Sequence, residues 1–186
     1  MLVWLSGFML LGFGALGLMV VLTYSGPLSR QSWLCLLAPA VGFGPCMVAA
    51  SEYALTVHVS TAGWGLSVIT GLLVSALLLM NQLPDRVVDA RFGRRHLAII
   101  HGPAAAASAY LLMMVMAAIL LIAAAVSGVL PLSTLPAVLP FLLLVPILLQ
   151  LRRHLLSGSG LTTALGANVL LVNSCLALIS IGLWIG

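Results

Sequence analysis

Two acidic residues and a run of arginines gather in one short polar stretch of the chain. Asp85 and Asp89 are two of its three acidic residues, and four of its seven arginines lie in the same segment, 81–95. On a helix, carboxylates at positions i and i+4 share one face. Mg²⁺ accepts one or two such carboxylates together with the phosphates of a substrate. The spacing therefore predicts Asp85 and Asp89 as metal ligands.

The arginines suit the other half of such a site. Arg94 and Arg95 follow the acids closely, and guanidinium groups match phosphate oxygens with their forked donors. Together the residues predict a site for a diphosphate headgroup whose apolar tail lies in a bilayer. A simpler interpretation is also open: loop arginines can serve only to orient a chain in the membrane, with the acids paired to Arg91 or Arg94.

Composition places this stretch in a membrane protein. The chain has 63% hydrophobic and 5% charged residues and a mean hydropathy of +1.28, whereas a soluble domain carries roughly a quarter charged residues. Spanning segments of about 20 apolar residues form helices, which satisfy their own backbone hydrogen bonds. The fold class predicted is an all-α, polytopic transmembrane helix bundle. No basic patch with interleaved aromatic residues indicates nucleic acid.

Six apolar runs are long enough to be predicted as spans, and together they make one transmembrane domain, 1–186, with a motif loop at about 81–102. We expect Pro84 to kink the third span, so that a separate short helix carries Asp85 and Asp89. The fifth span is expected to be short and kinked by its prolines. The six runs are Leu2–Thr23, Trp33–Thr56, Gly63–Leu83, Pro103–Val126, Leu135–Leu151 and Thr163–Ile185.

The arginines also predict the orientation of the chain. Arg30 follows the first run, the polar stretch follows the third, and Arg152 and Arg153 follow the fifth. All seven positive charges thus fall on one side, which the positive-inside rule makes cytoplasmic. The motif loop is predicted to face the cytoplasm.

The whole stretch Asn81–Gly102 resembles the second aspartate-rich motif of the UbiA superfamily of membrane prenyltransferases. It is most similar to the branch that prenylates 1,4-dihydroxy-2-naphthoate in menaquinone synthesis. Upstream, Gly42–Tyr53 and Tyr24–Pro27 resemble two further segments of that family. The matching positions of the motif are Asn81, Asp85, Asp89, Gly93, Arg95, Leu97 and Gly102.

The resemblance implies an enzyme. Asp85 and Asp89 would be catalytic and hold Mg²⁺ on a polyprenyl diphosphate, and Asn81, Arg94 and Arg95 would bind the diphosphate. The prenyl group would pass to an aromatic quinone precursor such as 1,4-dihydroxy-2-naphthoate. The implied location is the inner (cytoplasmic) membrane of a bacterium, with membrane lipid around the chain.

The departures from the family pattern leave a second hypothesis open. The six runs resemble the last six of the family's nine spans, and the first aspartate-rich motif is absent. His96 stands where the family has threonine, and Arg94 where it has lysine. The chain is then either a prenyltransferase that lacks its first three spans, or a non-catalytic relative that binds isoprenoid or completes its site with a partner chain. A transporter is a weaker third hypothesis, because charged residues within the spans are nearly absent.

Three further polar residues lie in or beside the spans. Glu52 is the third acid and is expected at the outer interface, where a functional role stays open. Asn168 and Asn173 in the last span are expected to form hydrogen bonds between helices.

Overall fold

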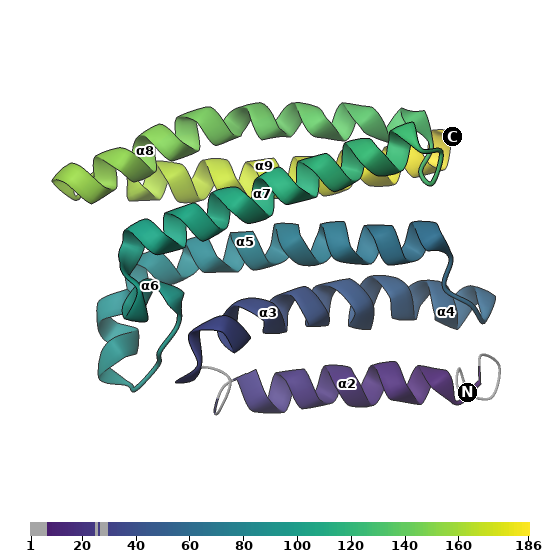
Figure 1. Ribbon diagram of the computed structural model, residues 1–186, viewed down its shortest axis with the longest axis horizontal. Coiled ribbons are helices and arrows are strands. Elements are labelled where there is room, and N and C mark those ends of the chain that lie inside the picture. The colour runs from purple at the N-terminus through teal and green to yellow at the C-terminus, as the bar shows by residue number, and fades with distance from the viewer. Residues whose placement is uncertain (1–6, 25, 27–29) are drawn as a thin grey trace.

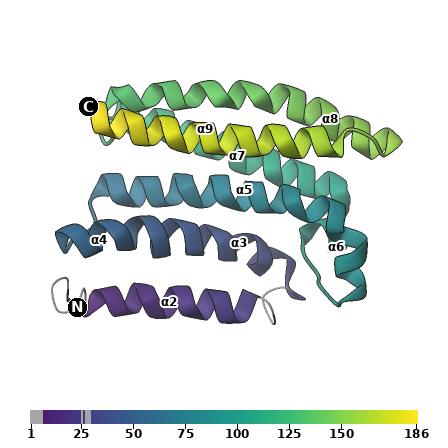
Figure 2. The same cartoon turned by 180° about the vertical axis from the view of Figure 1, so that it is seen from behind.

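The computed structural model describes residues 7–24, 26 and 30–186. Within them the chain is helical, without a strand (Figures 1 and 2). The helices run back and forth along one common axis (Figure 1). The elements are α2 (Met9–Tyr24), α3 (Ser32–Phe43), η2 (Gly44–Ala49), α4 (Ala50–Thr56), α5 (Thr61–Arg91), α6 (Leu97–Ile100), α7 (Gly102–Val126), η3 (Leu132–Leu143), α8 (Leu144–Ser157) and α9 (Leu161–Ile185).

Five helical stretches of the described chain are long and apolar enough to cross a membrane, which confirms the predicted all-α polytopic bundle. They are Ser32–Thr56, Thr61–Arg91, Gly102–Val126, Leu132–Ser157 and Leu161–Ile185. The first predicted span corresponds to α2, whose 16 described residues are apolar but short of that length. Residues 1–6, where that prediction begins, lie outside the described residues.

Helix α5 is the centre of the bundle. It packs against α3 on one side and α7 on the other, while α2 lies beyond α3 (Figures 1 and 2). In the most apolar 18-residue window of α5, 56% is buried inside the protein, which is the largest share among the five spans. The residues that position the polar stretch are therefore those that fix α5.

Glycines allow α3 and α5 to approach closely. A Cβ at Gly71 would lie 2.7 Å from the carbonyl oxygen of Ala40, and a Cβ at Gly44 would overlap the carbonyl oxygen of Ser67. Small residues permit such backbone contact between membrane helices, where van der Waals packing drives association. The contact fixes α5 against α3 in the middle of the bundle.

Prolines change the helix type in two spans. Proline lacks an N–H and crowds the preceding turn. Pro45 is the second residue of the π-helical stretch η2, and Pro136 and Pro140 lie in the 3₁₀ stretch η3. The predicted irregularity of the fifth span is thus present. Its predicted shortness is wrong, because η3 and α8 together form a stretch of 26 residues.

The prediction for Pro84 is correct in one part and wrong in the other. Helix α5 extends from Thr61 to Arg91 with Pro84 inside it, so no separate short helix carries Asp85 and Asp89. Its last turns nevertheless bend away from the axis of the rest of the helix, as the predicted kink requires (Figures 1 and 2). Pro84 is exposed, and proline inside a helix is a common cause of a sharp kink. The 31 residues of α5 correspond to about 46 Å of helix measured along its path at ~1.5 Å per residue, against ~30 Å for a hydrocarbon core. Helix α5 is therefore longer than one crossing of the apolar layer requires.

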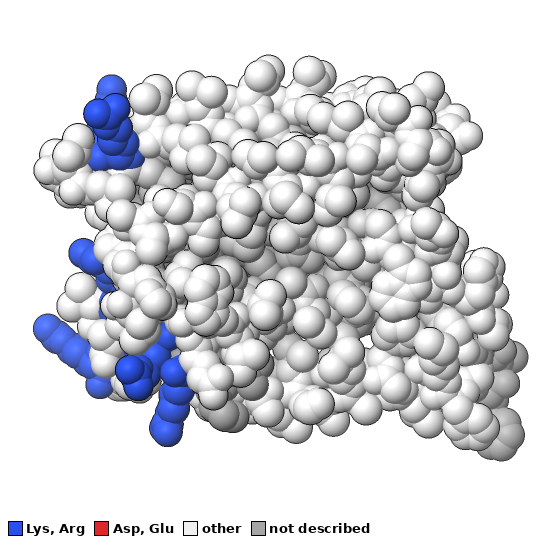
Figure 3. Space-filling view, viewed as in Figure 1, with Lys and Arg blue, Asp and Glu red and all other residues white. Residues whose placement is uncertain are grey.

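All arginines lie at one end of the bundle, which we call the arginine end. Figure 3 shows the arginine side chains of one face gathered there. This end comprises the start of α3, the end of α5 with the loop to α6, and the end of α8, whereas α2 begins and α9 ends at the opposite end (Figure 1). The alternation of charge along the sequence thus corresponds to a real clustering in space.

Candidate active site at the arginine end

Asp89 is the best connected of the predicted site residues. Its Oδ2 lies 3.4 Å from Nη1 of Arg94 and 3.3 Å from Nε2 of His96. The three side chains differ in burial: Arg94 is 49% exposed, Asp89 15% and His96 1%. Asp89 therefore lies at a boundary, with a solvated cation on one side and a buried imidazole on the other.

The turn after α5 brings these groups together. Phe92 ends the helix and Gly93 follows with φ of +78°, the left-handed conformation that glycine commonly supplies just past a helix end. The amide of Arg94 then donates to the carbonyl oxygen of Asp89 at 3.0 Å. This closed turn sends the chain back beside Asp89 and leads directly to His96.

Asp85 and Asn81 lie on the same helix but have no such partners. Because α5 is continuous, Asn81, Asp85 and Asp89 follow one another along one face at one-turn intervals. Asn81 and Asp85 are exposed. Among the described residues, no hydrogen bond or ion pair involves the side chain of either. Their polar atoms are free to meet a ligand.

Asp85 and Asp89 are oxygen ligands of the type that a hard divalent cation accepts. No group of three or more His, Cys, Asp or Glu residues that could hold a metal is found in the described chain, which is unlike a closed structural zinc site. Mg²⁺ retains waters and binds through one or two carboxylates plus phosphates. Asp89 meets its protein partners through Oδ2, and within the described residues its Oδ1 has none. Oδ1 of Asp89 is thus a carboxylate oxygen without a protein partner among the described residues.

His96 is a residue whose position the sequence did not reveal. Burial lowers its pKa below the ordinary value, and the charge of Asp89 opposes that shift only in part. The imidazole is therefore held mainly in its neutral form. The only sequence signal was its place, immediately after the arginine pair where the resembling family has threonine.

Arg95 faces a different neighbour from Arg94. It lines a cavity of about 250 Å³ together with Arg30, Gln31, Ser32, Trp33 and Ile100. Arg30 and Arg95 are exposed, and neither has an ion-pair partner among the described residues. The structure thus brings Arg30, which the sequence suggested only as an orientation charge, into one cavity with a predicted diphosphate ligand.

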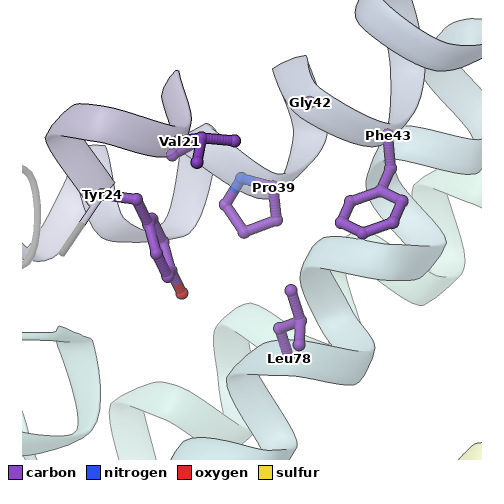
Figure 4. Close-up of a pocket in the computed structure, with 7 residues that line it drawn as sticks. Val21, Tyr24, Pro39, Gly42, Phe43 and Leu78 are labelled. Carbon is purple, nitrogen blue, oxygen red and sulfur yellow. The ribbon is translucent and has the colours of Figure 1, made fainter. Parts of the chain in front are cut away.

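An apolar cavity lies between α2, α3 and α5. It has a volume of about 220 Å³ and is lined by Val21, Tyr24, Ala38, Pro39, Gly42, Phe43 and Leu78. Figure 4 shows the Tyr24 ring, Pro39, Phe43 and Leu78 around this space. Tyr24 also contacts Cys35 and Gln82, and Gln82 donates to the Cys35 sulfur at 3.6 Å. Whole-ligand pockets commonly exceed ~300 Å³, so this cavity has room for part of a ligand.

Glu52 lies at the far end of α5 and has a structural partner. Its Oε1 accepts from the amide of Ser60, the N-cap of α5, at 3.2 Å, while the Ser60 hydroxyl accepts from the amide of Gly63 at 3.0 Å. A Cβ at Gly63 would overlap Oε2 of Glu52. Glu52 thus satisfies the start of α5 and takes no part in the site at the arginine end.

The two asparagines of α9 behave differently. Tyr110 of α7 donates to Oδ1 of Asn168 at 3.0 Å, which confirms the expected bond between helices. The expectation for Asn173 is wrong, because its amide donates to the carbonyl of Val169 in its own helix at 2.9 Å. Asn168 is buried and Asn173 exposed, so only the former faces a neighbouring helix.

Comparison with known proteins gives one family. The model of the UbiA prenyltransferase family matches residues 1–159, which include the whole of α5, the arginine end and both cavities. The match ends just before α9 begins. No curated protein and no solved structure matches the chain.

Proposed function

Because the chain belongs to the UbiA prenyltransferase family, we propose that it transfers a polyprenyl group from a polyprenyl diphosphate to an aromatic quinone precursor such as 1,4-dihydroxy-2-naphthoate, with Mg²⁺. The family supports an integral membrane prenyltransferase acting on aromatic acceptors. The observation that carries the finer proposal is that Asp85 and Asp89 lie at the same end of one apolar bundle as Arg94, which pairs with Asp89, and as Arg30 and Arg95, which share a cavity.

The proposed diphosphate site uses residues from the end of α5, from the loop between α5 and α6, and from the segment just before α3. Asp85 and Asp89 hold Mg²⁺, and Asn81, one turn before Asp85, orients the headgroup. Arg94 and Arg95 bind phosphate oxygens, and we add Arg30 because it shares a cavity with Arg95. When bound, Mg²⁺ supplies positive charge to the diphosphate oxygens as they become a leaving group.

The proposed roles of the remaining residues are binding and exclusion of water. The apolar cavity beside Tyr24 is open to part of the prenyl chain or the acceptor ring. Its lining is almost wholly apolar, which keeps water away from an allylic cation. The arginine end is proposed to face the cytoplasm, and the membrane is proposed to be the inner membrane of a bacterium.

A second candidate function rests on the small number of acids. Asp85 and Asp89 are the only acidic residues of the sequence at the arginine end. A chain with two carboxylates can bind a diphosphate with Mg²⁺ and still need a partner chain to complete turnover. In that case it binds isoprenoid without catalysis on its own.

The test separates binding from turnover. The chain in lipid nanodiscs is supplied with Mg²⁺, a polyprenyl diphosphate and 1,4-dihydroxy-2-naphthoate, and the prenylated product is measured by mass spectrometry. We expect product with the natural residues and none with Asp85→Asn. Binding of the diphosphate is measured in parallel. Binding that depends on Asp85 without product favours the partner-chain function, and binding that ignores Asp85 and Asp89 contradicts both.

A further inference from the structure

His96 is the only buried histidine of the four in the chain. Its relative exposure is 1%, whereas His58 and His101 are exposed and His154 is half-buried. It immediately precedes α6, and the next two residues, Leu97 and Ala98, are core residues. The backbone around His96 is thus packed into the bundle, and the ring has a fixed position.

This burial has a cost that packing alone does not explain. Neither ring nitrogen of His96 has an aligned hydrogen bond within the described residues. A buried polar group without a partner costs about 1–3 kcal/mol, so an apolar side chain would fill the space with less penalty. The nearest polar group is Asp89, with Oδ2 at 3.3 Å from Nε2. A carboxylate only accepts hydrogen bonds, so this contact can become a hydrogen bond only when Nε2 carries the hydrogen and the two groups align.

Arg94 approaches the same oxygen but holds it less firmly. Its Nη1 is 3.4 Å from Oδ2, and its side chain is 49% exposed. Solvent-exposed ion pairs contribute little, because water screens them and long side chains are mobile. In the proposed function Arg94 also turns to a phosphate oxygen. His96 is then the fixed neighbour that remains beside Asp89.

We propose that His96 is a positioning residue for Asp89: it restrains Oδ2 from the buried side, so that Oδ1 is presented to a divalent cation. The inference rests on the proposed function, since it concerns the same carboxylate. Residues that hydrogen-bond to metal-binding carboxylates orient them, and their loss commonly weakens metal binding about 10–100-fold. The proposed role is that of a histidine at a motif position where the family pattern has threonine.

The test compares apolar and hydrogen-bonding replacements. His96→Leu and His96→Met remove the donor, and His96→Gln keeps an N–H that can reach Asp89. Binding of Mn²⁺, used in place of Mg²⁺, is measured by electron paramagnetic resonance in nanodiscs with inorganic diphosphate present. We expect both apolar variants to weaken Mn²⁺ binding about 10-fold or more, and the glutamine variant to restore most of it. His101→Leu, at an exposed histidine, is the matched control and should bind as the natural chain does.

The outcomes distinguish this inference from the proposed function. If Asp89→Asn abolishes Mn²⁺ binding while His96→Leu and His96→Met bind normally, His96 does not position Asp89 and the proposed function stands. If the apolar variants and the glutamine variant weaken Mn²⁺ binding equally, the inference is also overturned. That result would mean that His96 fills space and that its N–H donor has no role. The methionine variant is included since its flexible side chain fills irregular space should leucine prevent folding. Binding of Mn²⁺ that is independent of Asp85 and Asp89 overturns both proposals.

Discussion

The two ends of α5 use acidic side chains in opposite ways. At its start, Glu52 accepts from the amide of Ser60 at the positive pole of the helix, where a carboxylate is favourable. At its end, Asp89 lies in the last turn, where the negative pole makes a carboxylate unfavourable. The first acid stabilises the fold at its position, and the second lies against its local electrostatics with Arg94 as its ion-pair partner. An acid maintained where the fold does not favour it indicates a function other than stability.

Loss of the acids at the end of α5 should have the largest effect. We expect Asp85→Asn and Asp89→Asn each to reduce product formation by about 100-fold or more, because removing a group that stabilises charge in the transition state costs ~10²–10³ in rate. Thermal unfolding followed by tryptophan fluorescence should be unchanged or shifted slightly upward. A variant that is both inactive and clearly less stable would show that these acids stabilise the fold, as Glu52 does.

The packed middle of α5 should respond in stability. Gly71→Ala puts a Cβ 2.7 Å from the carbonyl oxygen of Ala40, and overpacking of this kind costs about 1–3 kcal/mol. The expected result is a lower unfolding temperature in detergent. Gly65→Ala is the matched control on the same helix, because a Cβ at Gly65 meets nothing within 4 Å. Equal behaviour of the two variants would contradict the close contact of α3 and α5.

The arginines of the shared cavity should act on substrate binding. Arg30→Ala and Arg95→Ala are each expected to raise the KM for the polyprenyl diphosphate about 10-fold, the loss of one charge-assisted hydrogen bond of about 1.5 kcal/mol. The unfolding temperature should not change. Arg153→Ala, at the end of α8, removes an arginine outside that cavity and should leave KM unaltered. If all three variants raise KM alike, the arginines act through overall charge alone.

The start of α5 should show the smallest effect. Glu52→Gln keeps the size of the side chain and removes its charge, so about 0.5–1 kcal/mol of helix-start stabilisation should be lost. A modestly lower unfolding temperature with unchanged activity per folded molecule is expected. Loss of activity without loss of stability would instead give Glu52 a functional role and remove the contrast between the two ends.

Much of the fold could be predicted from the sequence because the patterns that define membrane spans extend over about 20 residues each. Apolar runs and arginine alternation located the last five spans and the arginine end, since a bilayer imposes length and charge asymmetry directly. The separate short helix predicted after Pro84 is absent because a proline can lie inside one helix that bends. The short fifth span failed because a 3₁₀ stretch tolerates Pro136 and Pro140 where a regular α-helix would have ended.

The candidate site was predicted only as far as it is local in sequence. Asp85 and Asp89 share a face because they are four residues apart, which needs no tertiary structure. The meeting of Arg30 with Arg95 joins segments 65 positions apart, and no pattern within either segment indicates it. The burial of His96 depends on how the chain returns after Gly93, which spacing alone does not give.

The continuity of α5 couples the orientation of the acids to the membrane-embedded part of the same helix. Each residue added to an α-helix turns everything beyond it by about 100°. One extra residue between Gly71 and Asp85 would therefore rotate the carboxylates away from the imidazole, although every side chain involved was still present. The number of residues between Gly71 and Asp85 therefore sets the direction in which the carboxylates face.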